Sequence, residues 1–503
     1  MRKILIALGI VALLIVSIPV VLLATGTIDS TSLRMMLNVM AGVSGPSANE
    51  GTLRQRYQVP QGFSLQLYAN DIPRARFLRF TPSGDLLVSR PHSGDILLLR
   101  RDDNEDGSPD GRETLIDGLS RPLGMAISDG WLYVAESNRI GRVLFDSSTG
   151  KLTGEYQAII EDLTDNGNHW SKTIGIGPDN KLYLAQGSTC NVCEEGDARR
   201  ATIMRFELDG SNAETVATGL RNSVGFDWAP WSGELYATDN GRDLLGDDFP
   251  PCELNHIQQD HFYGWPYYNG ANLPDPDMGE DPLAGQRQPT APVHNFSPHN
   301  APLGMTFLAA DTDTLPDDYQ NSALAALHGS WNRSTPDGYK VVSLHWSEEG
   351  IEQRDFLTGF NQDGDISGRP VDVAQGPDGA IYVSDDYAGA IYRISYGTAA
   401  TTNTVSLAMP VTSRLDAQAP LWLEEVNMPD MARRGEALYQ RYQCRSCHEY
   451  GANPKRLEGL ADRLGYGAVI DTLAAPKSPM PLFPLSESQR RELAVFLLTR
   501  DTP

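Results

Sequence analysis

One short pattern recurs along the middle of the chain and limits the folds that this sequence can adopt. An apolar residue leads into a turn rich in Pro, Asp, Asn and Gly, and the turn leads into an aliphatic and aromatic segment. The pattern occurs at residues 80–89, 126–135, 176–185, 228–237 and 375–384, with a weaker copy at 325–330. In such turns Pro fixes its own φ and Gly supplies a positive φ, so each copy predicts a β-hairpin.

Further apolar segments follow several copies and would pair with them. They lie at residues 96–100, 141–145, 202–206 and 390–394. Six hairpin units in series predict a mainly β fold, a six-bladed β-propeller over residues 55–396. The 47 Gly and 33 Pro residues suit a turn-rich β chain. Loops at one end of the blades converge on a central mouth, where we expect the function to lie.

The composition is that of a folded, acidic protein with more than one domain. The 503 residues carry 41 Lys and Arg against 65 Asp and Glu, a formal net charge of −24. The length predicts two or three domains. Because phosphate binding needs basic surface, the charge argues against nucleic acid as a partner and against docking on anionic lipid.

The N-terminus carries an apolar run long enough to cross a membrane. Arg2 and Lys3 precede residues 4–24, which contain no charged side chain. At about 1.5 Å per residue, a helix over this run would be about 32 Å long, which exceeds the apolar region of a cleaved signal peptide. The sequence favours an uncleaved anchor at residues 1–26 over a removed signal, followed by a linker at 27–54. The rest of the chain would then be periplasmic and tethered to the inner membrane.

The C-terminal part changes character after the last hairpin. Residues 397–429 are rich in Thr, Ala, Ser and Pro, which predicts a linker. Residues 430–503 then show helical spacing, with a last helix expected at about 487–498. We expect a small all-α domain here.

The C-x-x-C-H motif in this domain is typical of c-type haem attachment. Cys444 and Cys447 would form the covalent links to the porphyrin, and His448 would bind the iron. Met480 lies between two prolines and is the only methionine after the motif, so we expect it to be the sixth ligand. Zinc would need a second ligand pair, and no Cys or His follows His448. The sequence therefore predicts a cytochrome c domain.

Several loop motifs of the predicted propeller resemble those of the glucose/sorbosone dehydrogenase family. They lie at residues 168–179, 187–195, 219–222, 263–266, 328–334 and 368–371. Members of that family are six-bladed enzymes that oxidise aldoses or related sugar aldehydes with pyrroloquinoline quinone (PQQ). A fused cytochrome c is similar to the arrangement of extracellular PQQ sugar dehydrogenases that pass electrons onward. The resemblance covers most of residues 55–395.

The resemblance implies roles for particular residues. His169 matches the general base that takes the hydroxyl proton of the sugar. The residues that match contacts to PQQ are Arg221, Asn222 and Arg369. Arginines suit this role, because guanidinium groups bind carboxylates well and PQQ is a tricarboxylate. Arg333 stands near a position where soluble glucose dehydrogenases carry a lysine, and we expect it to substitute.

The resemblance also implies a calcium ion beside the quinone. The main-chain carbonyls of Gly241 and Arg242 match the family's calcium ligands. A second arginine of the family, two positions after Arg369, is replaced by Val371. This departure and Arg333 leave the identity of the sugar open.

A separate acidic segment satisfies a calcium-loop pattern. The spacing D-x-N-x-D-G-x₅-E begins at residue 102, and its candidate ligands are Asp102, Asn104, Asp106, Asp110 and Glu113. Without flanking helices this would be a loop site that braces a blade. An acidic turn exposed to solvent is the alternative.

The remaining cysteines belong to the predicted propeller. In an oxidising compartment Cys190 and Cys193 are expected to form a small-loop disulfide, although either could pair with Cys252. A redox-active C-x-x-C is a further alternative. Cys252 would otherwise be a buried thiol.

Taken together, the motifs predict a membrane-anchored quinohaemoprotein dehydrogenase. A sugar or related alcohol would lose a proton to His169 and a hydride to PQQ. The haem would then pass electrons singly to an external acceptor, which could be a cytochrome, the quinone pool or a terminal oxidase. Two alternatives are a calcium-dependent propeller hydrolase of the lactonase type and a binding or sensor propeller with an electron-relay cytochrome.

Overall fold

The computed structural model describes residues 45–309, residues 314–397 and part of the chain between 432 and 499. The chain divides into two compact units, Met1–Met409 and Pro410–Pro503. The expected membrane anchor at residues 1–26 lies outside the described residues. None of the helices within the described ranges is long and apolar enough to span a bilayer.

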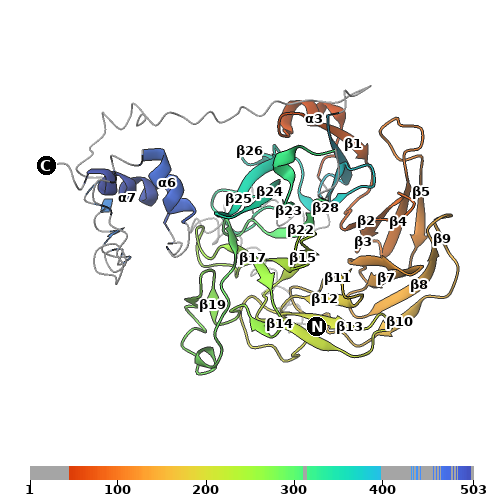
Figure 1. Ribbon diagram of the computed structural model, residues 1–503, viewed down its shortest axis with the longest axis horizontal. Coiled ribbons are helices and arrows are strands. Elements are labelled where there is room, and N and C mark those ends of the chain that lie inside the picture. The colour runs from red at the N-terminus through yellow and green to blue at the C-terminus, as the bar shows by residue number, and fades with distance from the viewer. Residues whose placement is uncertain are drawn as a thin grey trace, which may run out of the picture. The chain divides into compact units, whose positions relative to one another are not determined.

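The first unit is a ring of six β-sheets, as the hairpin pattern predicts (Figure 1). Blade 1 consists of β2 (Leu78–Phe80), β3 (Leu86–Arg90), β4 (Asp95–Arg100) and β5 (Gly111–Ile116). Blade 2 consists of β6 (Met125–Ser128), β7 (Trp131–Ala135), β8 (Ile140–Asp146) and β10 (Gln157–Ile160), with β9 (Lys151–Leu152) beside β8. Blade 3 consists of β11 (Lys172–Ile176), β12 (Leu182–Gln186), β13 (Thr202–Phe206), β14 (Glu214–Thr218) and β18 (His261–Phe262).

The other three blades complete the ring. Blade 4 consists of β15 (Ser223–Trp228), β16 (Leu235–Asp239), β17 (Cys252–Ile257) and β21 (His294–Phe296). Blade 5 consists of β22 (Pro302–Phe307), β23 (Ser322–Leu327), β24 (Lys340–Ser347) and β25 (Gly350–Leu357). Blade 6 consists of β28 (Pro370–Gln375), β29 (Ile381–Asp385), β30 (Ala390–Tyr396) and, from the start of the ring, β1 (Phe63–Ala69).

Short elements decorate this ring. Two-stranded ribbons are formed by β19 (Tyr268–Asn269) with β20 (Leu273–Pro274) and by β26 (Asn361–Gln362) with β27 (Asp365–Ile366). Two single turns of 3₁₀ helix occur at Ala284–Gln286 and Asp317–Tyr319. Helix α3 (Glu50–Arg56) begins after Asn49, whose side chain caps it, so the end of the expected linker 27–54 is helical.

Turn chemistry explains the hairpins that the sequence predicts. Gly84 and Gly379 adopt φ of +92° and +75° between the first two strands of blades 1 and 6, and Asn180 takes φ of +57° in blade 3. Blade 5 departs from the pattern. Its first two strands are joined by residues 308–321, and the weak copy expected at 325–330 includes only the end of β23 and the start of the next loop.

The core lies between neighbouring blades. Six separate clusters of buried apolar side chains fill the six interfaces of the ring. One tyrosine of the repeated pattern is buried in four of these interfaces: Tyr133, Tyr183, Tyr236 and Tyr382. Each sheet therefore buries both of its faces, which explains why the repeated segments are almost continuously apolar.

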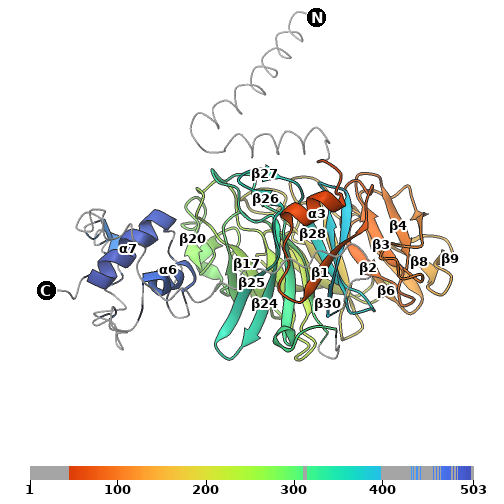
Figure 2. The same cartoon turned by 90° about the horizontal axis from the view of Figure 1, so that it is seen from above.

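All six blades present equivalent ends on the same side of the ring. The first strands of the blades (β2, β6, β11, β15, β22 and β28) contact one another around the centre and line a channel of about 640 Å³. We call the side on which these strands begin the loop face, and α3, β26 and β27 lie on this side, at the top of Figure 2. The loops that join the second and third strands of each blade are also on the loop face.

The second unit contains helices in its described part. These are α6 (Tyr466–Ala474) and α7 (Glu487–Thr499), which contact each other. Helix α7 begins where the sequence predicts a last helix. A cluster of buried apolar side chains lies around the two helices.

Candidate active site

The structure places the predicted propeller site residues on the loop face. His169, the pair Arg221 and Asn222, and Arg369 precede the first strands of blades 3, 4 and 6. The other predicted residues lie on loops between second and third strands: Gly241 and Arg242 in blade 4 and Arg333 in blade 5. The fold therefore brings residues from four blades to one face of the ring.

Two buried aspartates hold the backbone at two of these positions. Asp239 ends β16, and its carboxylate accepts the N–H of Arg221 at 2.9 Å and that of Asn222 at 2.5 Å. Asp385 ends β29 and accepts the N–H of Arg369 at 2.9 Å. Burial raises the pKa of Asp239 to about 7 and that of Asp385 to about 6. Sequence reasoning missed both, although each lies within two residues of the end of a copy of the repeated pattern.

His169 is held through its Nδ1 atom. Nδ1 lies 2.9 Å from the hydroxyl oxygen of Ser188, and that hydroxyl donates its single proton to the carbonyl of Cys190 at 2.7 Å. The Ser188 oxygen must then accept a hydrogen bond from His169. This assigns the hydrogen of the imidazole to Nδ1 and leaves Nε2 with a free lone pair. Burial, together with the nearby positive charge of Arg221, lowers the pKa of His169 to about 3. The imidazole is therefore neutral at physiological pH.

A buried arginine that the sequence did not single out supports the His169 loop. The guanidinium of Arg200 is 2% exposed and donates to the carbonyls of Gly187, Thr164, His169 and Ser188. It thereby ties the segment before β11 to the loop after β12. Nothing local in the sequence signals this role, because all of its partners are backbone atoms of other segments.

Lys172 is a second buried basic side chain beside the same loop. Its ammonium group donates to the carbonyls of Trp170 at 2.9 Å and Thr164 at 3.1 Å. Burial lowers its pKa to about 7. The positive charges of Arg221 and Arg200 favour a neutral imidazole at His169 and an anionic ligand on the loop face.

Arg221 is enclosed by oxygen atoms from two loops, the disulfide loop and the 240–251 loop. Its Nε donates to the carbonyl of Asn191 at 3.0 Å, and its Nη1 donates to the carbonyl of Asn240 at 3.1 Å. Its Nη2 donates to Oδ1 of Asn191 at 2.9 Å and to the carboxylate of Asp243 at 2.8 Å. The side chain is 4% exposed. The orientation of this guanidinium is thus fixed before any ligand binds.

The guanidinium of Arg369 makes fewer hydrogen bonds than that of Arg221. Its Nε donates to the carbonyl of His328 at 3.2 Å and its Nη2 to that of Gly329 at 3.1 Å. Within the described part of the chain, no hydrogen bond from its Nη1 to another residue is found. His328 itself lies 3.0 Å from Asp386, which forms a 2.7 Å ion pair with Arg76. A chain of polar contacts on this side of the site therefore runs from Arg369 through His328 and Asp386 to Arg76.

The guanidinium of Arg333 contacts the 240–251 loop and residues near it. Its guanidinium donates to the carbonyls of Asp247, Pro298 and Thr335 and lies 3.6 Å from the carboxylate of Asp248. The structure therefore gives this guanidinium structural partners in the 240–251 loop and its surroundings. Contact between Arg333 and a quinone stays a prediction.

Two asparagine residues outside the 240–251 loop offer oxygen atoms of the kind that calcium prefers, and one of them, Asn332, contacts Asp243 of the loop. A Cβ on Gly241 would lie 2.5 Å from the carbonyl oxygen of Pro251, so this close approach requires glycine. The Arg242 side chain forms a buried ion pair with Asp275 at 2.7 Å. Oδ1 atoms of Asn300 and Asn332 are buried without a hydrogen-bond partner, and amide oxygens are suitable Ca²⁺ ligands. Ligation by the Gly241 and Arg242 carbonyls stays a prediction.

The predicted calcium loop lies on the side opposite the loop face, between β4 and β5. Asp102 accepts the N–H groups of Asp106 at 3.0 Å and Gly107 at 2.7 Å. Asn104 donates to Asp110 at 2.7 Å. The fold therefore brings together four of the five predicted ligands. Glu113 is different: it pairs with Arg100. Calcium binding by this loop stays a prediction.

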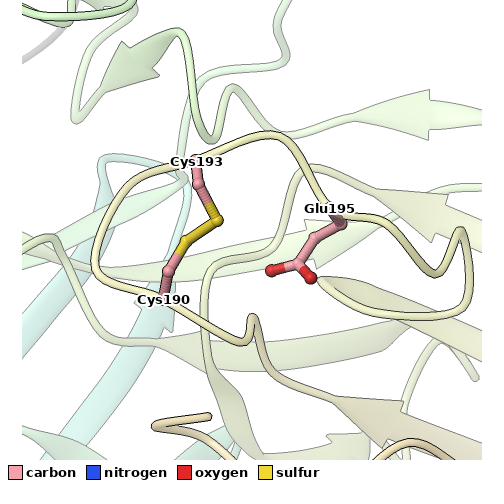
Figure 3. A group of neighbouring side chains, drawn as sticks. All are labelled: Cys190, Cys193 and Glu195. Atoms are coloured by element: carbon pink, nitrogen blue, oxygen red, sulfur yellow. A yellow bond between two sulfur atoms is a disulfide. The ribbon is translucent and has the colours of Figure 1, made fainter. Parts of the chain in front are cut away.

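The cysteines of the propeller are assigned by the structure. Cys190 and Cys193 form a disulfide, and Cys252 is a buried cysteine outside it whose pKa burial raises to about 11. Glu195 lies close to the two sulfur atoms (Figure 3). Its carboxylate accepts the N–H and the hydroxyl of Thr189, at 2.6 and 2.9 Å. Because sulfur atoms in a disulfide are not thiolates, this group is a braced loop rather than a metal site.

The profile of the TrAA12-like family matches residues 57–261 and 276–397. The chain belongs to the TrAA12-like family. The match covers all six blades, and its gap falls in the excursion between β17 and β21 of blade 4, which contains β19 and β20.

This TrAA12-like chain is similar in sequence to three curated proteins. An uncharacterized protein of Borreliella burgdorferi is 32% identical over 67% of this chain and 90% of its own length. The pyrroloquinoline quinone-dependent pyranose dehydrogenase of Coprinopsis cinerea is 33% identical over 68% of this chain. This chain spans about half of that enzyme, 55%. The aldose sugar dehydrogenase YliI of Escherichia coli is 25% identical over 53% of this chain and 72% of its length.

Solved structures share the fold of the TrAA12-like unit. The iodide structure of the Trichoderma reesei AA12 enzyme has a TM-score of 0.59 at 21% identity, covering 67% of this chain and 97% of that one. The holo form of the PQQ domain of the Coprinopsis cinerea pyranose dehydrogenase has a TM-score of 0.57 at 21% identity, covering 70% and 98%.

The unit that follows the TrAA12-like ring contains an apolar cavity of about 140 Å³. Cys444 and Met480, two of the predicted haem-binding residues, both line it, although they are far apart in the sequence. The other lining residues come from around α6 and α7 and include Tyr439, Leu460 and Leu493. Cys447 and His448 lie outside the described residues.

Proposed function

We propose that this chain is a PQQ-dependent sugar dehydrogenase. The observation that carries the proposal is His169: a neutral imidazole on the loop face whose Nε2 is left as a proton acceptor by the bond from Nδ1 to Ser188. Membership of the TrAA12-like family supports it, as do relatives that are named for sugar dehydrogenase activity. A propeller of the lactonase type would need a calcium-bound water instead of this base.

The residues on the loop face fit the charge of the cofactor. PQQ is a tricarboxylate, and its anionic groups suit a face that carries the buried guanidinium groups of Arg221 and Arg369. Asn222 and, through its calcium, the 240–251 loop would complete the contacts. When bound, PQQ would supply the hydride acceptor, and Ca²⁺ would supply a Lewis acid beside it.

The chain's own contribution to the reaction is proton transfer and orientation. His169 would take the hydroxyl proton of the sugar at Nε2 while Ser188 accepts the hydrogen of Nδ1. Because the Ser188 hydroxyl is itself tied to the carbonyl of Cys190, the ring is held in one tautomer and one orientation. Arg200 fixes the backbone of both segments, so the base is positioned before the substrate arrives.

We propose in addition that the second unit binds a c-type haem. The motif residues Cys444 and Cys447 would hold the porphyrin, and His448 and Met480 would bind its iron. Support comes from the apolar cavity that Cys444 and Met480 share, because a haem needs an apolar pocket with these ligands at its edge. Haem would supply single-electron transfer to an external acceptor, which could be a cytochrome, the quinone pool or a terminal oxidase.

The proposed location follows from the apolar run at residues 4–24. It would hold the enzyme at the periplasmic side of the inner membrane, where a disulfide between Cys190 and Cys193 can form. A small sugar would reach the loop face without transport into the cell.

The test is sugar-dependent reduction of the haem. Purified protein is loaded with PQQ and Ca²⁺, mixed with a panel of aldoses, and followed by the absorption band of reduced haem and, separately, by reduction of an artificial dye. We expect both signals with at least one sugar and neither signal without PQQ. Dye reduction without haem reduction would contradict only the electron relay. Loss of both, together with lactone hydrolysis that needs only Ca²⁺, would replace the dehydrogenase by a hydrolase.

A further inference from the structure

Asn191, one of the two residues between the cysteines of the disulfide loop, contacts several parts of the site at once. Asn191 lies between Cys190 and Cys193 and is half-buried. Its carbonyl accepts hydrogen bonds from Nε of Arg221 at 3.0 Å and from the indole N–H of Trp265 at 3.2 Å. One loop residue thus joins the proposed cofactor-binding arginine to the excursion between β17 and β21.

The side-chain amide of Asn191 makes a second set of bonds. Its Oδ1 accepts from Nη2 of Arg221 at 2.9 Å and from the backbone N–H of Asp243 at 2.8 Å. Its Nδ2 donates to the backbone carbonyl of Asp243 at 3.1 Å. Asp243 in turn accepts Nη2 of Arg221 at 2.8 Å. Asn191 therefore grips the backbone of the 240–251 loop at two points and holds both the arginine and its counter-charge.

The disulfide limits where Asn191 can go. It closes a ring over residues 190–193, so the carbonyl of Asn191 cannot turn away from Arg221 without moving both cysteines. The neighbouring carbonyl, that of Cys190, accepts the Ser188 hydroxyl that orients His169. The same four-residue ring thus supports the base on one side and the arginine on the other.

We infer that Asn191 is a positioning residue for Arg221, and that the Cys190–Cys193 disulfide is a redox-sensitive clasp on the cofactor site. The inference rests on the proposed function in assigning Arg221 to quinone binding. Opening the clasp is a thiol–disulfide exchange: an external dithiol loses two electrons and two protons and becomes a disulfide, and Cys190 and Cys193 become two thiols. The ring is then open, and Asn191 no longer has a single position.

The first measurement needs no cofactor. Backbone hydrogen exchange at Asp243 is followed by mass spectrometry in the oxidised protein, in protein reduced with dithiothreitol and in Asn191→Ala. We expect exchange at Asp243 to rise at least about tenfold in the last two samples, because its N–H loses a fixed acceptor. Asn138→Ala changes an exposed asparagine in the corresponding loop of blade 2 and should leave exchange at Asp243 unchanged.

The second measurement is the dissociation constant for PQQ, from quenching of tryptophan fluorescence in the presence of Ca²⁺. Reduction and Asn191→Ala should each weaken binding about tenfold, and the two together should weaken it no further, because both act through one element. Asn191→Asp keeps an acceptor for Arg221 but loses the donor to Asp243, so its effect should be smaller. The thermal unfolding midpoint serves as the fold control, and reduction of the native chain requires no substitution.

The outcomes separate the two proposals. If the oxidised wild-type chain binds no PQQ, the proposed function fails, and the clasp is judged by hydrogen exchange at Asp243 alone. If the wild-type chain binds PQQ and reduction changes neither the dissociation constant nor the exchange at Asp243, the clasp is wrong. Equal weakening in Asn138→Ala would also overturn it, because the effect would then not depend on Asn191.

Discussion

Two sides of the loop face are built on the same plan and hold their charged groups differently. On the blade 4 side, the guanidinium of Arg221 donates to three residues of two loops, one of which is the disulfide loop. On the blade 6 side, Arg369 donates to two carbonyls of one loop, those of His328 and Gly329. In both cases a buried aspartate at the end of the second strand accepts the arginine's backbone N–H. The two arginines differ in the partners of their guanidinium groups.

The histidines on the two sides differ in the same way. His169 donates from Nδ1 to a neutral hydroxyl, which leaves Nε2 as an acceptor. His328 has Nε2 only 3.0 Å from Asp386. Burial raises the pKa of Asp386, but His328 and Arg76 outweigh this and hold it well below its usual value, so the ionised carboxylate accepts the hydrogen of Nε2. One histidine is therefore left with an acceptor nitrogen and the other is a hydrogen-bond donor, although burial lowers the pKa of both.

The largest expected effect separates these two histidines. His169→Asn should lower kcat about 10²–10⁴-fold, the range of a lost general base, with little change in PQQ binding. His328→Asn should change kcat less than about tenfold and should instead lower thermal stability, since Asp386 loses a buried partner. Steady-state kinetics and thermal melts on both variants test the assignment. A reversed ranking of kcat would exchange the two roles.

The two arginines should also respond differently. Removing either guanidinium should weaken PQQ binding about 10-fold to 100-fold, because a charge-assisted bond to a carboxylate is lost. Arg221→Ala should in addition lower the unfolding midpoint, since it leaves the carboxylate of Asp243 without its ion pair. Arg369→Ala should have a smaller effect on stability, because only carbonyls lose a donor. Calorimetric titration and thermal melts distinguish the two, and equal losses of stability would remove the contrast.

The pH dependence provides a milder test. The pKa of His169 is lowered to about 3 by burial and by Arg221, so the base stays unprotonated, and activity should not fall as pH decreases through 6.5. Unfolded His169 binds a proton below about 6.5 but the folded chain does so only near 3. Its contribution to stability is thus present above pH 6.5 and is lost as pH falls toward 3. An acid limb of kcat/KM centred near 6.5 would show that the imidazole is solvated.

The smallest expected effect lies outside the site altogether. If the loop at residues 102–113 binds calcium, adding Ca²⁺ should raise the unfolding midpoint by about 2–5 °C, and Asp102→Ala should abolish that part of the rise. Because this loop is on the side opposite the loop face, Asp102→Ala should leave kcat unchanged. A Ca²⁺ effect on stability that survives in this variant would assign it to the 240–251 loop instead.

The sequence anticipates the ring because its hairpins are encoded locally. Gly84 and Asn180 adopt the positive φ that their turns require, and the strands follow from the apolar segments beside them. The sequence between the first two strands of blade 5 contains no copy of the turn pattern, so it predicts only the end of β23. The pairing of β1 with β30 has no local signal at all, since it joins strands from opposite ends of the ring.

The site was predicted in part for the same reason. His169, Arg221 and Arg369 are found from motifs that resemble a family, and the structure places each of them before a first strand. Ser188 and Arg200, which hold His169, were missed because the imidazole and the backbone carbonyls that they contact come near only in the folded chain. Such bonds leave no spacing or periodicity in the sequence. The contacts of the Arg333 side chain could not be predicted either, because a matching position in the sequence does not reveal which way a guanidinium points.

The pairing of β1 with β30 also has a kinetic consequence. Phe63 lies opposite Tyr396, so the ring closes through contacts between residues that more than three hundred positions separate. The entropy cost of such a long loop delays this contact until the intervening blades have formed. Because Gly397 donates to the carbonyl of Gly62, a circular permutant that joins these two positions and starts between two other blades would replace the slowest closure by a covalent bond.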